Sequence, residues 1–255
     1  MANRYESLES AVVLITGAAR GLGAALARSF AEQGSRLVLT DIDTEGLSAI
    51  AGDLALSPDR ISLIPADLVD TAAGERLVEA SVDAFGRLDV LVNNAALMDG
   101  VALEEITPDL FDRVLAVNLR APLFLSRAAL AVMKSQGGGR IVNVASMAAR
   151  TGGAYPTVFC YAASKGGLLA LTKSFARVGA PDGVLVNAVL PSNIDSPMLW
   201  GPFAGEAVKR TLAAVPLGRP AQGEEVAELV LWLASSSSSY VTGASWDING
   251  GWFMT

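Results

Sequence analysis

Residues 11–23 read AVVLITGAARGLG, in which an unbroken apolar run leads into a turn with three glycines. Such a run is typical of a strand that is buried on both faces of a sheet. Gly17 can make the tight turn out of the strand, Gly21 lets the backbone approach a pyrophosphate, and Gly23 allows close packing of the next helix. The N–H groups and the dipole at the start of that helix favour phosphate. The stretch predicts a phosphate-binding strand–turn–helix unit, with a purely structural turn as the alternative.

The alternation of strand and helix continues along the chain. Besides residues 11–15, apolar runs predict strands at 36–40, 61–64, 88–92, 140–145 and 184–189, with a weaker one at 245–248. Helical patterns lie between them, notably at 22–33, 71–85, 108–134, 161–178 and 224–234. This order predicts an α/β, Rossmann-type fold: a doubly wound parallel sheet of about seven strands with helices on both faces. No linker breaks the pattern, so a single domain is expected.

Composition narrows the class of protein. The net charge of −7 argues against nucleic acid or an anionic membrane as a partner. No apolar run approaches the roughly 18 residues that span a bilayer, and the N-terminal segment lacks the apolar stretch of a signal peptide. We therefore expect no membrane partner and a cytoplasmic location. The single cysteine, Cys160, cannot form an internal disulfide and is expected to be a small buried apolar residue.

The chain contains no histidine, which excludes histidine-dependent triads and histidine-ligated zinc, and no metal site is predicted. Acid–base chemistry must come from Tyr, Lys, Cys or a carboxylate. Tyr161 and Lys165 are one helical turn apart, so their β-carbons lie about 5–6 Å apart on one face. A neighbouring ammonium would lower the phenol pKa from about 10 toward the working range. The alternative is a chance pair with the lysine on a solvated face.

Three further polar residues stand at informative places. Asp41 closes the second predicted strand, where a carboxylate suits the hydroxyls of an adenosine ribose; it could instead be a helix N-cap. Asn118 lies in an otherwise apolar stretch, where a buried polar side chain needs a partner. Ser146 follows the fifth strand, and by itself it could be an ordinary turn residue.

In this order, these features resemble the short-chain dehydrogenase/reductase family in its compact single-domain type. The resemblance covers residues 10–252 and rests on the turn at 16–23, Asn93-Asn94-Ala95, Asn118, Ser146, Tyr161 with Lys165, and Pro191 after the sixth strand. It implies an NAD(P)-dependent oxidoreductase that interconverts a secondary alcohol and a ketone by hydride transfer. It also implies that residues 1–255 form one dinucleotide-binding and catalytic domain.

The resemblance implies four catalytic roles. Tyr161 exchanges a proton with the substrate oxygen, and Lys165 lowers its pKa and holds the nicotinamide ribose. Ser146 donates a hydrogen bond to the same oxygen, a contribution of the oxyanion type. Asn118 bends its helix and holds a water that links Lys165 to solvent.

The resemblance also implies the cofactor contacts. Asp67 reads the adenine edge, while Asn93 and Ala95 support the adenosine side. Ile194 offers backbone groups, and Ser196 its hydroxyl, to the nicotinamide carboxamide. The whole expected set is Gly17, Arg20, Gly21, Leu22, Gly23, Asp41, Asp67, Leu68, Asn93, Ala95, Tyr161, Lys165, Pro191, Ile194 and Ser196.

The chain departs from the family pattern in three places, all beside the expected pocket. Ala96 and Ser192 stand where glycine is usual, and the segment between Ser146 and Tyr161 is about two residues longer than expected. The longer segment weakens any transfer of substrate identity. Asn94 is expected to have a structural role.

NAD is expected as the cofactor in preference to NADP. A 2′-phosphate would face the Asp41 carboxylate, with Asp43 nearby, and like charges about 4 Å apart repel by about 1–4 kcal/mol. Arg20 acts in the opposite direction, but Asp41 points at the ribose itself.

The substrate is expected to be a small, mostly apolar, cyclic or aromatic alcohol or ketone. The expected walls are Leu97, Met98, the loop 147–159, and Met198, Leu199, Trp200 and Phe203 after the sixth strand. The charged residues there are Asp99, Arg150 and Asp195, too few for a polyanion. A sugar or polyol stays open because Thr151, Tyr155 and Asn193 could bind hydroxyl groups.

Two other functions stay open as alternatives. A reductase of 3-oxoacyl thioesters would use NADPH and need a basic docking surface, which the net charge of −7 and Asp41 disfavour. A non-catalytic nucleotide-binding module is disfavoured by the complete set of Asn118, Ser146, Tyr161 and Lys165. The family's use of the helices at 108–134 and 161–178 as interfaces, together with the apolar tail at 250–254, predicts a homotetramer, with a dimer as the alternative.

Overall fold

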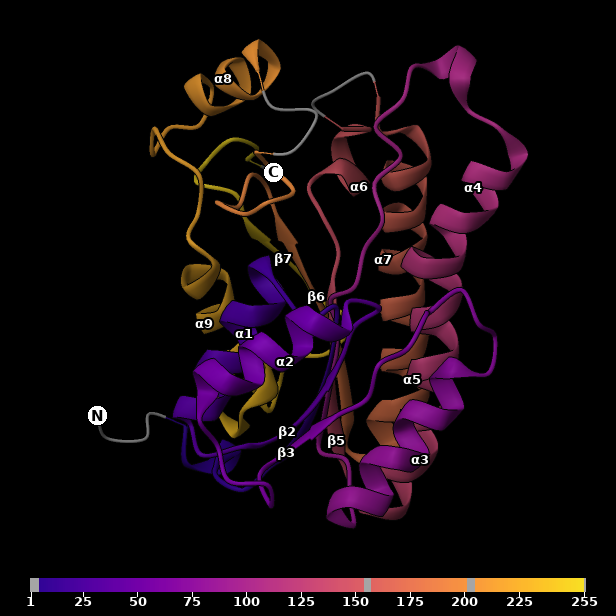
Figure 1. The fold of residues 1–255 in the computed structure, drawn as a ribbon, viewed down its shortest axis with the longest axis vertical. Helices are drawn as coiled ribbons and strands as arrows, with labels where there is room; N and C mark the ends of the chain where they lie inside the picture. Colours follow the sequence, from indigo (N-terminus) through magenta and orange to yellow (C-terminus); the bar gives the residue numbers. More distant parts are fainter. Residues whose placement is uncertain (1–4, 154–156, 201–204, 255) are drawn as a thin grey trace.

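The computed structural model describes residues 5–153, 157–200 and 205–254. Within these residues seven strands form one sheet in the order β3-β2-β1-β4-β5-β6-β7, and every neighbouring pair is parallel (Figure 1). The strands are β1 (Val12–Thr16), β2 (Arg36–Thr40), β3 (Ile61–Leu63), β4 (Val90–Asn93), β5 (Gly139–Val144), β6 (Val184–Pro191) and β7 (Ser245–Ile248). This confirms the predicted doubly wound sheet, whose strand order reverses between β1 and β4.

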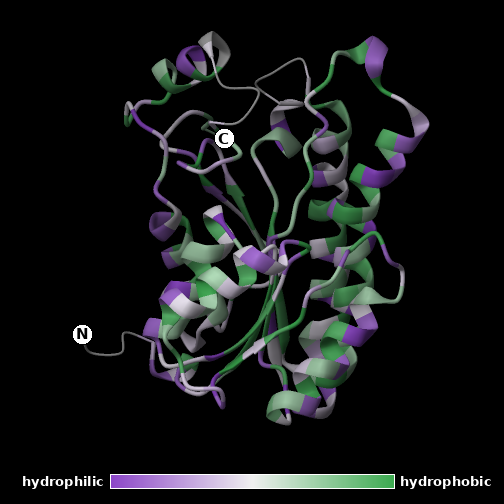
Figure 2. Cartoon of the chain, in the orientation of Figure 1, coloured by the Kyte–Doolittle hydropathy of each residue, from purple (hydrophilic) through white to green (hydrophobic). Residues whose placement is uncertain are grey.

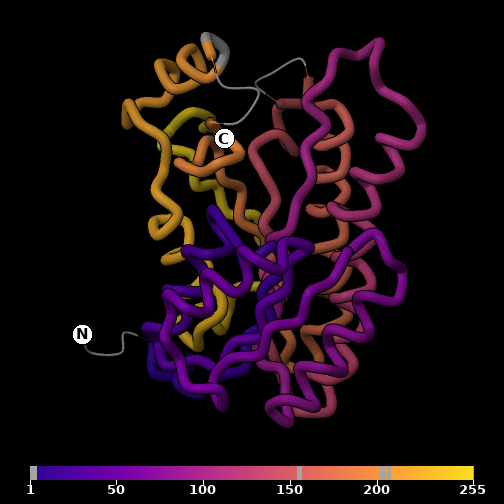
Figure 3. Tube along the Cα trace, in the orientation of Figure 1, coloured from indigo at the N-terminus to yellow at the C-terminus, as the bar shows by residue number. Residues whose placement is uncertain are grey.

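Helices cover both faces of the sheet. They are α1 (Gly21–Glu32), α2 (Thr44–Leu54), α3 (Ala73–Phe85), α4 (Pro108–Leu115), α5 (Ala121–Ser135), α6 (Ala148–Thr151), α7 (Phe159–Gly179), α8 (Glu206–Ala213) and α9 (Gly223–Ala234). Figure 1 places α1, α2 and α9 on one face and α3, α4, α5 and α7 on the other, with α6 and α8 toward the top of the view. In Figure 3 the helix α1 near the N-terminus and the helix α9 near the C-terminus lie side by side, so both ends of the chain contribute to the same helical layer.

Alternate residues of the strands face the two helical layers. Val13 and Ile15 pack with α1 and α9, whereas Val12 and Leu14 pack with α3 and α5, and all four are fully buried. This period of two is why β1 is apolar at every position. In Figure 2 hydrophobic colour follows the strands and the inner sides of the helices. Burying one such side chain contributes about 1.5–3 kcal/mol, so the central strands carry much of the stability.

The helix expected over residues 108–134 is not one regular α-helix. A π-helical turn at Ala116–Arg120 separates α4 from α5. Pro122 gives a physical reason, because it lacks the N–H that would donate to the carbonyl of Asn118 in an α-helix. The wider turn directs Asn118 into the protein, where it is fully buried.

The same continuous stretch, Pro108–Ser135, is long and apolar enough by composition to cross a membrane, which the sequence reading did not anticipate. Half of its apolar window is buried inside the fold. A core helix passes such a test as readily as a membrane span does, so the stretch is weak evidence for a membrane.

Most predicted elements are present with ends shifted by one or two residues, but three helices were not predicted. The helix α2 has a clear local signal in retrospect, because the Asp43 carboxylate accepts from the N–H of Gly46 at 2.9 Å and caps it. The helices α6 and α8 are short, and their positions depend on the loops around the sheet.

Two glycines of the first turn are required by close backbone contacts. Gly17 has a φ of 67°, and a β-carbon there would lie 2.8 Å from the Cα of Ala95. At Gly23 a β-carbon would overlap the carbonyl group of Gly17. The turn thus folds back on itself and on the end of β4, which no side chain at these positions would allow.

Gly23→Ala should destabilise the protein, and Gly52→Ala is its matched control. The methyl group of Gly23→Ala meets backbone that cannot yield, so the free energy of unfolding should fall by about 2 kcal/mol or more. Gly52 lies in α2 with open space around it, so Gly52→Ala should raise that free energy by about 0.5–1 kcal/mol. Urea unfolding measures both, and equal effects of the two substitutions would contradict the packing described here.

Candidate active site

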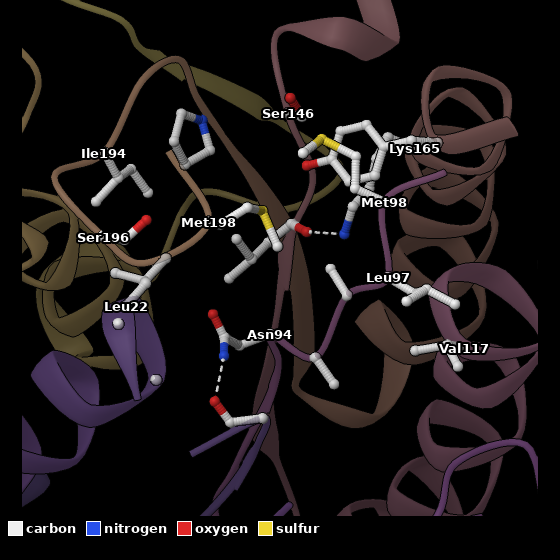
Figure 4. Close-up of a pocket in the computed structure, with 18 of the residues that line it drawn as sticks. Leu22, Asn94, Leu97, Met98, Val117, Ser146, Lys165, Ile194, Ser196 and Met198 are labelled. Carbon is white, nitrogen blue, oxygen red and sulfur yellow. Dashed lines mark hydrogen bonds between the residues drawn. The ribbon is translucent and has the colours of Figure 1, made fainter. Parts of the chain in front are cut away.

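One large cavity, of about 690 Å³, opens beside the point where the strand order reverses. It is lined from the ends of β2, β5 and β6, from the loops after the strands β1 to β6, from the helices α1, α4, α6, α7 and α8, from the π-helical turn and from the tail. Most of the expected site residues line it, namely Gly17, Arg20, Gly21, Leu22, Gly23, Asp41, Asp67, Leu68, Ala95, Ser146, Tyr161, Lys165, Pro191, Ile194 and Ser196. Figure 4 shows Leu22, Ile194 and Ser196 facing Leu97, Met98 and Lys165 across this space. The exceptions are Asn93 and Asn118.

The start of α1 opens onto the cavity. No side chain caps this helix, and Gly21, Leu22 and Gly23 line the wall with its first turn. Free N–H groups at the positive end of a helix dipole suit the phosphates of a dinucleotide, and the glycine turn leaves room for close approach. These residues therefore fit the expected cofactor.

Asp41 stands at the end of β2 on the cavity wall. Its carboxylate accepts from the N–H groups of Ala19 and Asp43, both at 3.0 Å, which holds it against the glycine turn. The alternative that Asp41 caps a helix is wrong, because Asp43 caps α2. Asp67 likewise lines the cavity, and it accepts from the N–H of Val69 at 2.9 Å.

Of the two asparagines at the end of β4, the expected role of Asn93 needs correction, and the structural role expected for Asn94 is confirmed. Asn93 points away from the cavity: its amide donates to Ser126 Oγ at 3.1 Å and to Asn143 Oδ1 at 2.8 Å inside the α5 layer. Side chains alternate across a sheet, so the end of β4 can send only one of its two asparagines to the cavity. Asn94 lines the cavity, where Figure 4 labels it, and it also braces the glycine turn, since its amide donates to the carbonyls of Thr16 and Gly17.

Asn118 does not line the cavity either. Its amide oxygen accepts from the N–H of Leu97, and its nitrogen donates to the carbonyl of Leu97, both at 2.8 Å. The same nitrogen lies 3.0 Å from Ser164 Oγ. Asn118 therefore has the partners that its burial requires, and it holds a wall of the cavity rather than forming one.

Lys165 is buried and lies close to Tyr161, which is partly buried on the cavity wall. Lys165 is 1% exposed, and its Nζ donates to the carbonyl of Val144 at 2.8 Å (Figure 4) and lies 5.6 Å from the centre of the Tyr161 ring. Burial lowers the pKa of Lys165 from 10.5 to about 7. Burial also raises the pKa of Tyr161, and a hydrogen bond with Ser146 opposes this only in part.

The expectation that Lys165 lowers the pKa of Tyr161 is therefore not met in the protein chain by itself. Desolvation penalises the charged form of both groups. A lysine that loses its proton near neutral pH is a weak source of positive potential for its neighbour. What the geometry does bring together is a protonated phenol, the Ser146 hydroxyl and an amine that can change charge near pH 7.

The part of the cavity that is expected to hold the substrate, its substrate end, is mostly apolar. Leu97, Met98, Met147, Val158, Met198, Leu199, Val208 and Trp252 line it, and the polar residues Arg113 and Ser192 also line the cavity. Trp252 was expected only at an interface, and Val208 on α8 was not expected at all. The tail is held by Asn249, whose amide donates to the carbonyl of Phe253 at 2.8 Å. Nothing in the sequence around these residues signals that contact.

Several expected pocket residues have other partners. Trp200 donates from Nε1 to Asp195 at 2.6 Å outside the cavity, and Thr151 donates to the carbonyl of Met147 at 3.1 Å. Arg150 pairs with Asp247 at 3.2 Å, and Asn193 does not line the cavity. Tyr155 and Phe203 lie outside the described residues.

Comparisons with known proteins agree with this geometry. The sequence profile of the family described as Enoyl-(Acyl carrier protein) reductase matches residues 17–253. An L-rhamnose 1-dehydrogenase (NAD(P)(+)) of Azotobacter vinelandii is 38% identical, over 95% of this chain and 96% of that protein. A cis-4-hydroxycyclohexanecarboxylate dehydrogenase of Sinomonas cyclohexanicum is 37% identical, over 97% and 98%.

A solved structure is also closely similar. The short-chain dehydrogenase/reductase described as a glucose/ribitol dehydrogenase from Brucella melitensis superposes with a TM-score of 0.90 at 33% identity, covering 98% of this chain and 99% of that one. This chain belongs to the short-chain dehydrogenase/reductase family and is an oxidoreductase that acts on alcohol and ketone groups.

The difference in free energy of unfolding between the wild type and Lys165→Met should depend on pH, because Lys165 is buried. Between pH 7 and 10.5 the unfolded chain holds a proton on Lys165 that the folded chain has released, so the wild-type free energy of unfolding rises with pH in this window. Relative to Lys165→Met, the gain should reach about 1.4 kcal/mol per pH unit. Tyr161 acts in the opposite direction, but only above about pH 10, and in both proteins.

Urea unfolding at pH 7, 8, 9 and 10 measures this difference. Lys173→Met, which removes an exposed lysine from the same helix, reports the change in net charge alone. A difference between wild type and Lys165→Met that stays flat or falls with pH would contradict the buried, desolvated lysine.

Proposed function

We propose that this chain is an NAD-dependent dehydrogenase that interconverts a secondary alcohol and a ketone, with Tyr161 as the acid/base. The observation that carries this is the meeting of Tyr161, Ser146 and Lys165 in a cavity whose other end is the glycine turn. Residues 1–255 would then act as a single dinucleotide-binding and catalytic domain in the cytoplasm.

The cofactor, when bound, supplies or accepts the hydride. In the direction of reduction, the Tyr161 phenol donates its proton to the substrate oxygen as that oxygen gains charge; in oxidation the phenolate takes it back. The raised pKa of Tyr161 keeps the phenol protonated, which is the form that donates in the direction of reduction. Ser146 donates a hydrogen bond to the same oxygen. Lys165, with a pKa of about 7, can replace the proton that Tyr161 gives up.

Tyr161→Phe should abolish turnover, because it removes the phenol hydroxyl that exchanges the proton. It should leave NADH binding nearly unchanged, because it keeps the aromatic ring. The Tyr161 phenol is hydrogen-bonded with Ser146 on the cavity wall, which supports it as the proton-transfer group. NADH formation with a panel of secondary alcohols measures turnover, and cofactor fluorescence measures binding. A variant that keeps more than a tenth of the wild-type kcat would overturn the mechanism.

The choice between NAD and NADP is argued from Asp41. Its carboxylate lines the cavity and is anchored by Ala19 and Asp43, so it cannot easily move away from a 2′-phosphate. Arg20 also lines the cavity and acts in the opposite direction, but it is exposed and can turn to solvent. We therefore assign a preference for NAD.

Asp41→Asn should shift the ratio of NADH to NADPH dissociation constants by at least about fivefold toward NADPH. The amide keeps one acceptor oxygen for the turn but removes the charge, which repels a phosphate by about 1–4 kcal/mol at 4 Å. Glu45→Ala, an exposed acidic residue in the first turn of α2, is the control for net charge. Tighter binding of NADPH than of NADH to the wild type would contradict the assignment.

The preferred substrate is a mostly apolar, cyclic alcohol or ketone. The substrate end of the cavity is lined mostly by aliphatic and thioether groups and by Trp252, although Arg113 also lines the cavity. The described residues Thr151 and Asn193 do not line it and so are not available there to bind hydroxyls. The relative named for hydroxycyclohexanecarboxylate fits this preference.

A sugar or polyol is the second candidate, favoured by the relative named for L-rhamnose and the structure named for glucose/ribitol. Values of kcat/KM for cyclohexanols against those for sugars and polyols decide between the two. A much larger value for the sugars would defeat the first choice.

Reduction of a 3-oxoacyl thioester is a weaker alternative. The description of the matching family profile points toward carrier-bound acyl groups. A relative named as a 3-oxoacyl-[acyl-carrier-protein] reductase is 37% identical and points the same way. The net charge of −7 and the Asp41 carboxylate oppose a basic docking surface and NADPH.

We assign a homotetramer, with a dimer as the alternative. Phe111 on α4, and Phe159 and Val178 on α7, are large apolar side chains exposed by 41%, 42% and 56%. Leu217 and Met254 form a second exposed apolar pair near the tail. Trp252 and Phe253 are partly buried in their own chain, so the tail is weaker support than the sequence suggested. Light scattering that shows a monomer at micromolar concentration would rule this out.

A further inference from the structure

A buried carboxylate from a distant loop holds the first turn of α7, the helix that carries Tyr161. Asp99, which follows β4, is 7% exposed. Its Oδ2 accepts from the N–H of Cys160 at 2.9 Å, and its Oδ1 accepts from the N–H of Tyr161 at 3.2 Å. The residue at the N-cap position, Val158, provides no side-chain cap.

This contact satisfies a requirement of the helix. The first N–H groups of an α-helix have no partner within it, and a buried helix start must find acceptors elsewhere. A carboxylate meets two of these donors at once and interacts favourably with the positive end of the dipole. No lysine or arginine of the described ranges forms an ion pair with Asp99, so the start of α7 is what stabilises its charge.

Asp99 completes a ring of hydrogen bonds around the backbone of Tyr161. On one side, Asp99 accepts from the Tyr161 N–H. On the other, Ser164 Oγ donates to the Tyr161 carbonyl at 2.7 Å and lies 3.0 Å from the Asn118 amide. That amide holds both backbone groups of Leu97, two residues before Asp99.

The segment from Leu97, which Asn118 holds, to Asp99, which holds the start of α7, is part of the cavity wall. Leu97 and Met98 line the substrate end, and Asp99 follows them directly. The wall that touches the substrate and the backbone of the proton donor are therefore tied to each other rather than to separate parts of the fold.

We propose that Asp99 is a positioning residue that fixes Tyr161 relative to the substrate wall. This inference rests on the proposed function of Tyr161. Asp99 lines no part of the cavity and touches no reacting atom; it acts through the first turn of α7. The cofactor-binding turn lies on a different element, so its contacts do not depend on Asp99.

Asp99→Ala removes both acceptors, and Asp99→Asn keeps one oxygen but turns an N–H donor toward the other backbone N–H. A displacement of about 1 Å at a reacting group can cost about 100-fold in rate. We expect kcat per NADH-binding site to fall roughly 10- to 100-fold in Asp99→Ala and less in Asp99→Asn. The KM for the substrate and the dissociation constant for NADH should change by less than about threefold.

Thr107→Ala is the matched control. Thr107 caps α4 through the N–H of Leu110 at 3.2 Å and is exposed, so its loss weakens a helix start away from the cavity. It should lower stability by a similar mechanism and leave kcat per NADH-binding site unchanged. Hydrogen exchange of the peptide that spans residues 158–164 should quicken in both Asp99 variants and not in Thr107→Ala.

Normalising kcat to bound NADH separates positioning from unfolding. A kcat per NADH-binding site within twofold of wild type in both Asp99 variants would overturn the inference, as would unchanged exchange of residues 158–164. A loss of NADH binding in proportion to activity would also overturn it, because it would show a merely structural role. If Asp99→Ala does not fold, Asp99→Asn carries the test. If the wild type turns over no alcohol or ketone, the proposed function fails, while hydrogen exchange still tests the contact between Asp99 and the start of α7.

Discussion

The site depends on a set of hydrogen bonds that joins the end of β1 to the end of β4. Thr16 Oγ1 accepts from the N–H groups of Asn94 and Ala95, both at 3.0 Å, and the Asn94 amide donates back to the carbonyls of Thr16 and Gly17. Gly17 can lie this close to Ala95 because it has no side chain. These contacts join the glycine-rich turn after β1 to the loop that carries Leu97 and Met98. Without them, the two halves of the cavity would have no fixed distance between them.

Burial, rather than pairing of opposite charges, sets the chemistry of the site. The Lys165 amine donates to a backbone carbonyl, and burial lowers its pKa; burial also raises the pKa of Tyr161, so the phenol keeps its proton. Partial exclusion of water strengthens the remaining interactions, which suits a reaction in which charge develops on one oxygen. Burying Lys165 and Tyr161 lowers the stability of the folded protein, and the burial of apolar side chains on both faces of the sheet offsets this cost.

Local patterns were sufficient for the architecture and for the acid–base pair. The continuous apolar strands, the glycine turn and the spacing of Tyr161 and Lys165 are short-range features, and the structure has the sheet they predicted. The asparagines were harder to predict. Which of Asn93 and Asn94 faces the cavity depends on where β4 ends, and the π-helical turn at Asn118 depends on a proline four residues later. An error of one residue in a strand end reverses the direction of a side chain.

The sequence by itself determined the strand–helix alternation, the glycine-rich turn after β1 and the residue types available for proton transfer, because each follows from neighbours within a few positions. Only the tertiary structure decided that Asp99 holds the start of α7, that Trp252 returns from the tail to the cavity, and that Lys165 is buried deeply enough for its pKa to fall to about 7. These are contacts between segments far apart in the chain. Their formation depends on the packing of the whole sheet and its two helical layers, which no local pattern records.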